Sequence, residues 1–378
     1  MQSNLPTLQP MPLNWLEKTI NDKLKKSIQV RLEKVDIQIN GSRPWDIQVH
    51  NERLYQRVLL HGSLGLGEAY MEGWWDCPQL DQFFVHILRG NLHEEVAPRN
   101  LSSLWEAAIA GITNLQSLAR SFQVGEEHYD LGNDMFQLFL DPTMIYSSAI
   151  FDTPQMSLEQ ASVSKLDRIC RKLELKPEDH VIEIGAGWGG FAMHAAQHYG
   201  CKVTTTTISQ AQYALAKERI EAAGLTDRIH LLLQDYRDLE GQFDKLVSIE
   251  MIEAVGHEYY DTFFAKCASL LKPEGMMLLQ GITIADQRYE SAKNAVDFIQ
   301  RYIFPGSCIP SVTALLESST RASDLRLFNL EDIGPHYART LAEWRINFFN
   351  HIEQVRALGY SEEFIRMWEY YLCYCEGG

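Results

Sequence analysis

The chain lacks the features that mark several other classes of protein. No apolar stretch approaches the roughly 18 residues of a membrane span, and the first residues show neither the charged nor the apolar region of a signal peptide. No Gly-x-Ser-x-Gly elbow, P-loop or His-Glu-x-x-His motif is present, so hydrolase, kinase and metalloprotease functions lack support. The seven cysteines are scattered without a CxxC pair, which argues against a structural metal and favours the reducing cytoplasm.

Basic residues are also scarce. Lys and Arg number 34 against 50 Asp and Glu, which gives a formal net charge of −16. This balance argues against a nucleic-acid partner, because surfaces that bind nucleic acid normally carry excess positive charge. Any membrane contact must therefore use a local basic patch. One candidate consists of Lys18, Lys23, Lys25 and Lys26 with Arg31, and another of Arg339 with Arg345, although solvated helix faces are the simpler interpretation of both.

The length of 378 residues suits two domains. Residues 1–120 predict a small mixed α+β and helical module. Its expected elements are an amphipathic helix at 13–32, strands within 33–60, a turn into a helix at Gly62–Gly67, and helices within 79–120.

From about residue 160 the pattern alternates between strands and helices. The expected strands are 180–184, 201–208, 229–233, 244–250 and 276–284. The expected helices include 157–173, 210–223 and 258–271, with a turn at 272–275. Five strands alternating with helices predict an α/β fold, with a mostly parallel sheet that is covered on both faces.

A glycine-rich turn follows the first of these strands. Val181–Ile184 leads into Gly185, Gly187 and Gly189, and a helical pattern comes next, which is the context of a nucleotide-cradling loop. Glu183 lies two residues before the turn, and a carboxylate there is unfavourable beside a dinucleotide pyrophosphate. S-adenosylmethionine (SAM) carries a sulfonium and an ammonium group instead. The motif therefore favours SAM, with a plain dinucleotide loop as the alternative.

Ligands of open α/β sheets bind beyond the carboxyl ends of the strands. The second strand end carries Thr207 and Gln212, whose amide suits ribose hydroxyls. Asp235 at the third end suits an adenine amino group. The fourth end runs from Glu250 to Gly256, and Glu253 there is hard to leave as a bare buried charge. Other residues at these strand ends are Tyr236 and Arg237 at the third strand and Gln280 and Ile282 at the fifth. The upstream segment Tyr146-Ser147-Ser148 is expected to fold over the site as a lid.

Seven segments together resemble the cyclopropane-fatty-acyl-phospholipid synthases. They are EEHYDLGNDMF, YSSAIF, VIEIGAGWGGF, TISQAQ, IEAVG, RYIFPG and MWEYYLCYCEGG, in that order. The resemblance implies a class I, Rossmann-like SAM-methyltransferase fold. It also implies three parts: a lipid- and dimerisation-type module at 1–120, a lid or linker over the cofactor at 121–156, and a methyltransferase domain at 157–378. An insertion at about 285–324 is expected to cover the substrate.

The same resemblance implies roles for individual residues. The positions that match SAM contacts of the family are Tyr146, Ser147, Gly185, Thr207, Gln212, Tyr236 and Arg237. A bicarbonate ion acts as the base in the family. Glu253, Ile282 and Tyr337 match three of its ligands, whereas Ser148 and Gln280 stand where the family has Cys and His. Ser and Gln still offer hydrogen-bond donors to an anion, but neither can carry a positive charge.

The implied reaction is methyl(ene) transfer from SAM to the double bond of an unsaturated phospholipid acyl chain, which gives a cyclopropane fatty acid. Aromatic side chains are expected to stabilise the cationic intermediate. The candidates are Phe136, Phe139, Tyr146, Phe298, Tyr302, Phe304 and Trp344. Alternatives are a methylene- or methyl-branched product, a small-molecule N-methyltransferase, and a SAM- or lipid-binding protein without catalysis.

The resemblance carries three further expectations. The protein is expected in the cytoplasm, in transient contact with the inner membrane face, and as a homodimer. Residues 325–334 are expected to form a sixth strand. The chain reaches Gly378 without the seventh, antiparallel strand of such methyltransferases, which suggests truncation.

Overall fold

A computed structural model describes residues 15–90, 92 and 132–378, with side chains from Asn21 onward. The described residues fall into two compact units. The first unit comprises those within 1–103 together with 361–378, and the second unit comprises those within 104–360. The closing residues thus belong with the opening ones, whereas the sequence places them in a domain at 157–378.

The first unit is mainly helical. It contains α1 (Trp15–Glu33), α2 (Leu54–Met71), α3 (Leu80–Arg89), α18 (Glu362–Gly377) and an antiparallel pair of short strands, β1 (Gln48–Val49) and β2 (Trp75–Asp76). Helix α18 packs against α2 and α3. A cluster of aromatic rings explains this packing, since Tyr370 of α18 contacts Tyr70 of α2 and Phe84 of α3, with ring centroids 5.7 and 5.0 Å apart.

One sequence prediction fails in the first unit and another holds. Residues 33–60 alternate in polarity but form only β1 as a strand, and α2 begins at Leu54. The expected turn into a helix is present at Gly62, whose φ of 57° and ψ of −135° are not helical and divide α2 into two helical segments. Residues 93–120, where further helices are expected, lie outside the described part.

The second unit is built on a five-stranded parallel sheet in the order β5-β4-β3-β6-β7. The strands are β3 (His180–Ile184), β4 (Lys202–Thr207), β5 (Ile229–Leu233), β6 (Phe243–Ile249) and β7 (Leu271–Gln280). The predicted parallel sheet is therefore confirmed. The order reverses between β3 and β6, which places a ligand-binding crevice at the carboxyl ends of these two strands.

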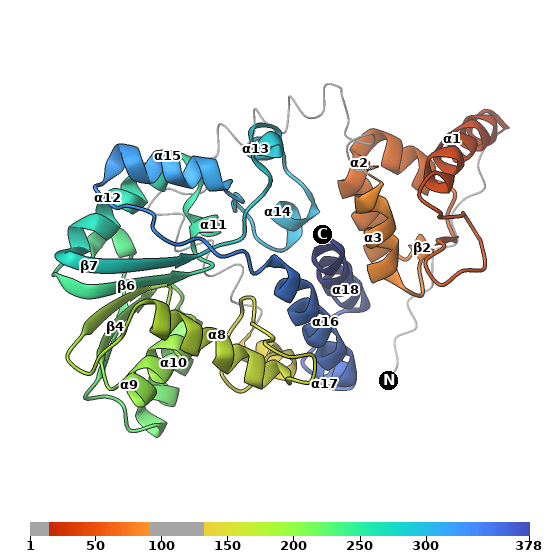
Figure 1. Cartoon of the computed structure of the whole chain (residues 1–378). Helices are drawn as coiled ribbons and strands as arrows, with labels where there is room; N and C mark the ends of the chain where they lie inside the picture. Colours follow the sequence, from red (N-terminus) through yellow and green to blue (C-terminus); the bar gives the residue numbers. More distant parts are fainter. Residues whose placement is uncertain (1–14, 91, 93–131) are drawn as a thin grey trace. The chain divides into compact units, whose positions relative to one another are not determined.

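Helices cover both faces of this sheet (Figure 1). On one face, α8 (Leu158–Lys172), α9 (Gly190–Tyr199) and α10 (Gln210–Ala222) pack on a core that includes Val181 and Val203. On the other, α12 (Tyr260–Leu270) packs on Ile182 and Leu246, and α15 (Val312–Ala322) packs on α12. Alternate residues of each strand thus face two separate cores, as the apolar strand runs predict.

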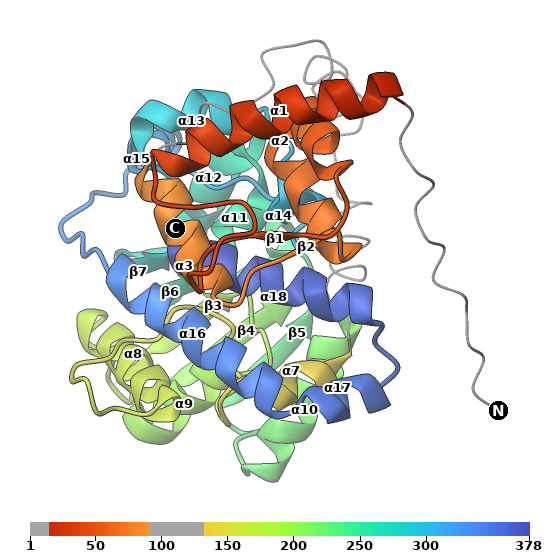
Figure 2. The same ribbon diagram turned by 90° about the vertical axis from the view of Figure 1, so that its right-hand side faces the viewer.

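Short elements surround the carboxyl edge. They are α7 (Asn133–Phe139), η1 (Tyr236–Asp238), α11 (Ile252–Val255), η2 (His257–Tyr259), α13 (Asp286–Ala292), α14 (Phe298–Tyr302), α16 (Gly334–Asn350) and α17 (Ile352–Ala357). Helix α7 packs against α10, α16 and α17 (Figure 2). None of the described helices is long and apolar enough to cross a membrane.

The expected sixth strand at 325–334 is wrong. Residues 325–333 form neither a helix nor a strand, and Gly334 begins α16. Leu327, Phe328 and Leu330 expose 57%, 75% and 67% of their surface, so their apolar side chains do not form a buried face. The turn at Lys272–Gly275 lies within β7 as a bulge, because the register jumps from Phe243↔Leu271 to Lys245↔Met276.

Candidate active site

The glycine-rich turn lies where β3 ends. Gly185, Gly187 and Gly189 have φ values of 100°, 51° and 84°, a region that favours glycine. The N–H groups of Gly185 and Ala186 donate to the carbonyl of Thr206 at 3.1 and 2.8 Å, which ties the turn to β4. A side chain on Gly187 would meet nothing within 4 Å, so the backbone there borders open space. The turn can approach a ligand closely.

Glu183 is buried just before this turn. Its Oε2 accepts a hydrogen bond from Thr205 Oγ1 at 2.6 Å, and burial raises the pKa of Glu183 to about 8. The carboxyl group is therefore held between β3 and β4 rather than presented to solvent. A direct contact between Glu183 and a cofactor stays a prediction.

The ends of β4 and β5 place their polar side chains together. Thr207 Oγ1 donates to Gln212 Oε1 at 2.8 Å, and both residues are buried. Asp235 accepts from Arg237 Nε at 2.8 Å and Nη2 at 2.7 Å, which is a bidentate ion pair. Burial favours a higher pKa for Asp235, yet the hydrogen bonds from Arg237 hold the pKa below its usual range. The pair fixes Asp235 as a carboxylate at the strand end.

The Tyr146-Ser147-Ser148 segment is anchored by a buried lysine. Lys165 of α8 is fully buried, and its Nζ donates to Ser147 Oγ at 2.7 Å. Burial lowers the pKa of Lys165 to about 8, opposed by the charges of Glu250, Asp141 and Glu183. The ammonium group of Lys165 thus interacts electrostatically with three carboxyl groups. This lysine was not among the sequence candidates, because a helix pattern does not show which polar residue turns inward.

A second carboxyl group organises the edge between β6 and β7. Glu250 Oε1 accepts from the backbone N–H of Ser148 at 2.9 Å and from Gln280 Nε2 at 2.8 Å. Its Oε2 accepts from the hydroxyl of Tyr337 at 3.0 Å. The structure therefore brings Ser148, Gln280 and Tyr337 together, as the sequence resemblance implies. They surround the carboxyl group of Glu250 instead of a bound anion.

Glu253 lies one turn further, on α11. Its Oε1 accepts from the backbone N–H of Ile282, and its Oε2 is buried without a hydrogen-bond partner among the described residues. Burial raises the pKa of Glu253 to about 8, and the charge of Glu250 adds to the rise. The two predicted residues Glu253 and Ile282 are thus in contact. An unpartnered buried oxygen at a strand end is a feature of functional sites.

Aromatic rings adjoin this cluster. Tyr146 lies against Phe136, Trp344 and Phe304, with ring centroids 5.2, 5.0 and 6.3 Å apart. The ring of Tyr337 meets Trp344 edge to face at 6.1 Å. Phe136, Phe139, Trp344 and Phe298 are buried, whereas Tyr146, Tyr302 and Phe304 retain partial exposure. The partly exposed rings are the ones placed to face a ligand.

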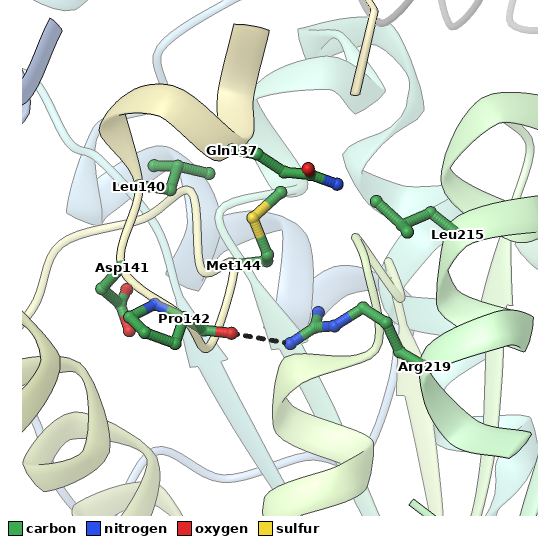
Figure 3. A pocket seen from close by; sticks show the side chains of 7 residues that line it. All are labelled: Gln137, Leu140, Asp141, Pro142, Met144, Leu215 and Arg219. Atoms are coloured by element: carbon green, nitrogen blue, oxygen red, sulfur yellow. Dashed lines mark hydrogen bonds between the residues drawn. The ribbon is translucent and has the colours of Figure 1, made fainter. Parts of the chain in front are cut away.

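A pocket of about 350 Å³ lies beside α7 and α10 (Figure 3). It is lined by Gln137, Leu140, Asp141, Pro142, Met144, Leu215 and Arg219. Arg219 closes one side by donating to the carbonyl of Pro142 at 2.9 Å, drawn as the dashed line in Figure 3. None of the sequence-predicted site residues lines this pocket.

Comparisons with known proteins point to one family. The family described as mycolic acid cyclopropane synthetase matches residues 116–378. The cyclopropane-fatty-acyl-phospholipid synthase of Escherichia coli is 45% identical over 349 residues, covering 92% of this chain and 87% of that protein. The tuberculostearic acid methyltransferase UfaA1 of Mycobacterium tuberculosis is 37% identical over 341 residues, covering 86% and 78%.

Solved structures give the same result for the fold. The mycolic acid cyclopropane synthase CmaA1, complexed with SAH and CTAB, aligns with a TM-score of 0.61 at 31% identity. The alignment covers 68% of this chain and 91% of that one.

Proposed function

Because the chain belongs to the mycolic acid cyclopropane synthetase family, we propose that it transfers a methylene group from SAM to the double bond of an unsaturated phospholipid acyl chain. The product is a cyclopropane fatty acid. The family, the Rossmann-like methyltransferase fold and the enzyme class predicted from the sequence motifs are confirmed.

One observation of the site carries this proposal. Two half-buried glutamates, Glu250 and Glu253, place their carboxyl groups where the strand order of a SAM-methyltransferase sheet reverses, with the partly exposed ring of Tyr146 close by. A proton acceptor beside an aromatic wall suits a reaction that passes through a carbocation. A methyl transfer to an amine also uses a proton acceptor, but it passes through no carbocation that an aromatic wall would stabilise.

SAM, when bound, supplies an electrophilic methyl group. We propose that the glycine turn at 185–189 receives it, with Thr207 and Gln212 at the second strand end and the Asp235–Arg237 pair at the third. Tyr146, Ser147 and Tyr236 complete the set. Their support is the convergence of these residues on the carboxyl edge of the sheet, which is where ligands of this architecture bind.

The chain's residues must supply positioning and a dry environment, because an alkene is a weak nucleophile. A double-bond carbon has to lie within about 3–3.5 Å of the methyl group. The segment around Tyr146 and the insertion at 285–324 are proposed to exclude water, which would otherwise quench the cation. The rings of Tyr146, Tyr302 and Phe304 are proposed to stabilise it by roughly 0.5–2 kcal/mol each.

The resemblance also implies a bicarbonate base, and the residues present do not fit one. The side chains of Gln280 and Tyr337 that would hold the ion already donate to Glu250, as does the backbone N–H of Ser148, while the Ser148 hydroxyl donates to the carbonyl of Ala149 at 3.2 Å. No step of the reaction is therefore assigned to bicarbonate.

We further propose a transient contact with the inner membrane face and a homodimer. The support for membrane contact is local: Lys23 and Lys26 of α1 are exposed, in a chain that is otherwise strongly acidic. Arg339, the other candidate, is engaged with the carbonyl of Met156 and the ring of Phe151. Flotation with neutral and anionic vesicles tests the first proposal, and light scattering tests the second.

A second product has some support. The relative UfaA1 is named a tuberculostearic acid methyltransferase, and the base cluster of this chain departs from the Cys and His expected at 148 and 280. A base placed differently would remove a proton elsewhere after a hydride shift, leaving a methylene branch instead of a ring.

The deciding experiment combines the protein, SAM and vesicles of monounsaturated phospholipid. The fatty acids are then identified by mass spectrometry. A fatty acid with a saturated methyl branch is heavier by two hydrogens than the other two products, so its mass identifies it. The cyclopropane and methylene-branched fatty acids have equal mass, and proton NMR distinguishes the ring from the alkene. Methylation of free amines without reaction on vesicles supports an N-methyltransferase instead. SAM binding without turnover of either substrate supports a binding protein.

A further inference from the structure

We propose that the carboxylate of Glu250 is the base that closes the cyclopropane ring, in place of a bound anion. The inference rests on the proposed function and assigns the proton-accepting step to one side chain. It makes this enzyme independent of bicarbonate.

The hydrogen bonds of Glu250 are the first argument. Three donors from distant parts of the chain converge on its two oxygens: Ser148 N–H, Gln280 Nε2 and Tyr337 O–H, at 2.8–3.0 Å. These are three positions at which the sequence resemblance places ligands of an anion. A carboxylate has the same planar pair of charged oxygens as bicarbonate, so it satisfies the same donors.

The backbone at Glu250 is the second argument. Glu250 has φ 47°, in the left-handed region that favours glycine. Such a conformation in a non-glycine residue persists only where the surroundings enforce it, and these positions cluster at functional sites. Glu250 combines this backbone conformation with hydrogen bonds from three donors to its carboxyl group.

The distribution of charge is the third argument. Burial raises the pKa of Glu250, whereas the hydrogen bonds from Ser148, Gln280 and Tyr337 and the ammonium group of Lys165 favour its ionised form. Burial and the charge of Glu250 together raise the pKa of Glu253 to about 8, so Glu253 is mainly protonated at neutral pH. The two carboxyl groups thus differ in their surroundings, and Glu250 is the one whose oxygens are held by three hydrogen-bond donors.

The step balances without a further reactant. The π electrons of the alkene form a bond to the methyl carbon, and the S–CH₃ bond breaks with its electrons going to sulfur. The Glu250 carboxylate then removes one proton from the new methyl group. The electron pair of that C–H bond closes the ring on the cationic carbon. Glu250 is left as a carboxylic acid and returns its proton to solvent.

Two variants and one change of buffer test the inference. Glu250→Gln keeps the size of the side chain and loses the base. We expect ring formation on monounsaturated vesicles to fall by about 10²-fold or more, while SAM binding measured by calorimetry stays within about twofold. The wild type is expected to keep its rate in CO₂-free buffer and to be insensitive to added bicarbonate.

Glu250→Gly provides the complementary test. Glycine accepts φ 47° without strain and opens a space of carboxylate size among the three donors. We expect this variant to be inactive in CO₂-free buffer and to regain ring formation when bicarbonate is added. Such rescue also demonstrates that the variant is folded. Glu240→Gln, at an exposed carboxylate outside the site, is the matched control and is expected to retain full activity.

Two results would overturn the inference while leaving the proposed function intact. They are substantial ring formation by Glu250→Gln, and loss of wild-type activity in CO₂-free buffer. Absence of any ring or branch formation by the wild type rejects the proposed function and, with it, this assignment.

Discussion

Single residues in the site depend on contacts that spacing does not reveal. The sequence motifs assign Glu253, Ile282, Ser148, Gln280 and Tyr337 to one site, and the structure joins them as two hydrogen-bonded groups. The sequence motifs predict the main role for Glu253 and none for Glu250. Both follow the same strand three residues apart, and only the hydrogen bonds of the folded chain show that Glu250 is the one held by the donors.

Burial of Glu253 makes a prediction about stability. Its pKa in the folded state is about 8, above the ordinary 4.5, because burial and Glu250 disfavour the charge. Between pH 4.5 and about pH 8, Glu253 therefore keeps a proton in the folded state that it has lost in the unfolded state. The stabilisation is fully present below about pH 4.5 and is lost as the pH rises through 8.

Glu253→Gln is expected to flatten this dependence. Both proteins are compared without ligand. The difference in the free energy of unfolding, variant minus wild type, should increase by at least about 1 kcal/mol from pH 5 to pH 8. Urea denaturation at the two pH values measures it. Parallel curves for the two proteins would show that Glu253 ionises normally. The pKa of Lys165 is lowered to about 8 in the folded state. Its effect on stability therefore begins above this pH range, where it makes the free energy of unfolding rise with pH.

Secondary-structure elements were predictable where burial leaves a clear pattern. Four strands of the sheet lie within one residue of their predicted bounds, and β7 overlaps its prediction at 276–280, because each is a run of apolar or β-branched residues next to a helix. The predicted strands within 33–60 and at 325–334 fail for one reason. A strand forms only when a neighbouring strand is available to pair with it, and the sequence does not show that neighbour.

The turn after β3 should be sensitive to a single methyl group. Gly185 has φ 100°, and a Cβ there would come within 3.3 Å of Met251 Cβ. Gly185→Ala is expected to strain the turn and to weaken SAM binding by roughly tenfold, about 1.4 kcal/mol. Calorimetry measures the affinity.

Gly359→Ala is the control for backbone strain. Gly359 has φ 96° and no atom within 4 Å of a Cβ, in the loop before α18. It is expected to lower stability without changing SAM affinity. Equal losses of affinity in both variants would mean that strain, not the shape of the turn, governs binding.

The exposure of the segment at 325–334 leads us to expect that two phenylalanines contribute very different amounts to stability. Phe328 is 75% exposed, whereas Phe348 on α16 is fully buried. Phe328→Ala is expected to change the free energy of unfolding by less than about 0.5 kcal/mol, and Phe348→Ala to lower it by about 3–5 kcal/mol. Chemical denaturation distinguishes these values. A large loss at Phe328 would indicate that the segment packs as a strand after all.

At the scale of the whole molecule, the family and the sheet were accessible from the sequence, but the composition of the two units was not. Motifs identify neighbours along the chain, whereas α18 joins the opening helices through contacts between distant positions. Arg366 donates to the carbonyls of Tyr70 and Trp75 and pairs with Asp76 at 2.7 Å. Tyr70 donates to Glu369 at 2.7 Å.

Removing this arginine tests whether α18 stabilises the first unit. Arg366→Ala removes hydrogen bonds to the carbonyls of Tyr70 and Trp75 and the ion pair with Asp76, and is expected to lower the free energy of unfolding by roughly 1.5–3 kcal/mol. Arg171→Ala, in an exposed pair with Asp167, is the control, with an expected loss below about 1 kcal/mol. Hydrogen exchange should place the loss in α2 and α3. Uniform loss across the protein would argue against a separate first unit.

The placement of α18 has a consequence for biosynthesis. Arg366 and Tyr70 are 296 positions apart, so translation must pass through the entire catalytic sheet between them. On the ribosome, the catalytic sheet can assemble as it emerges. The aromatic side chains of α2 and α3 that contact α18 in the folded protein remain uncovered until α18 has left the exit tunnel. The part of the protein that is made first is therefore the part that finishes folding last, and nascent chains halted before Ser361 should be the ones that chaperones retain.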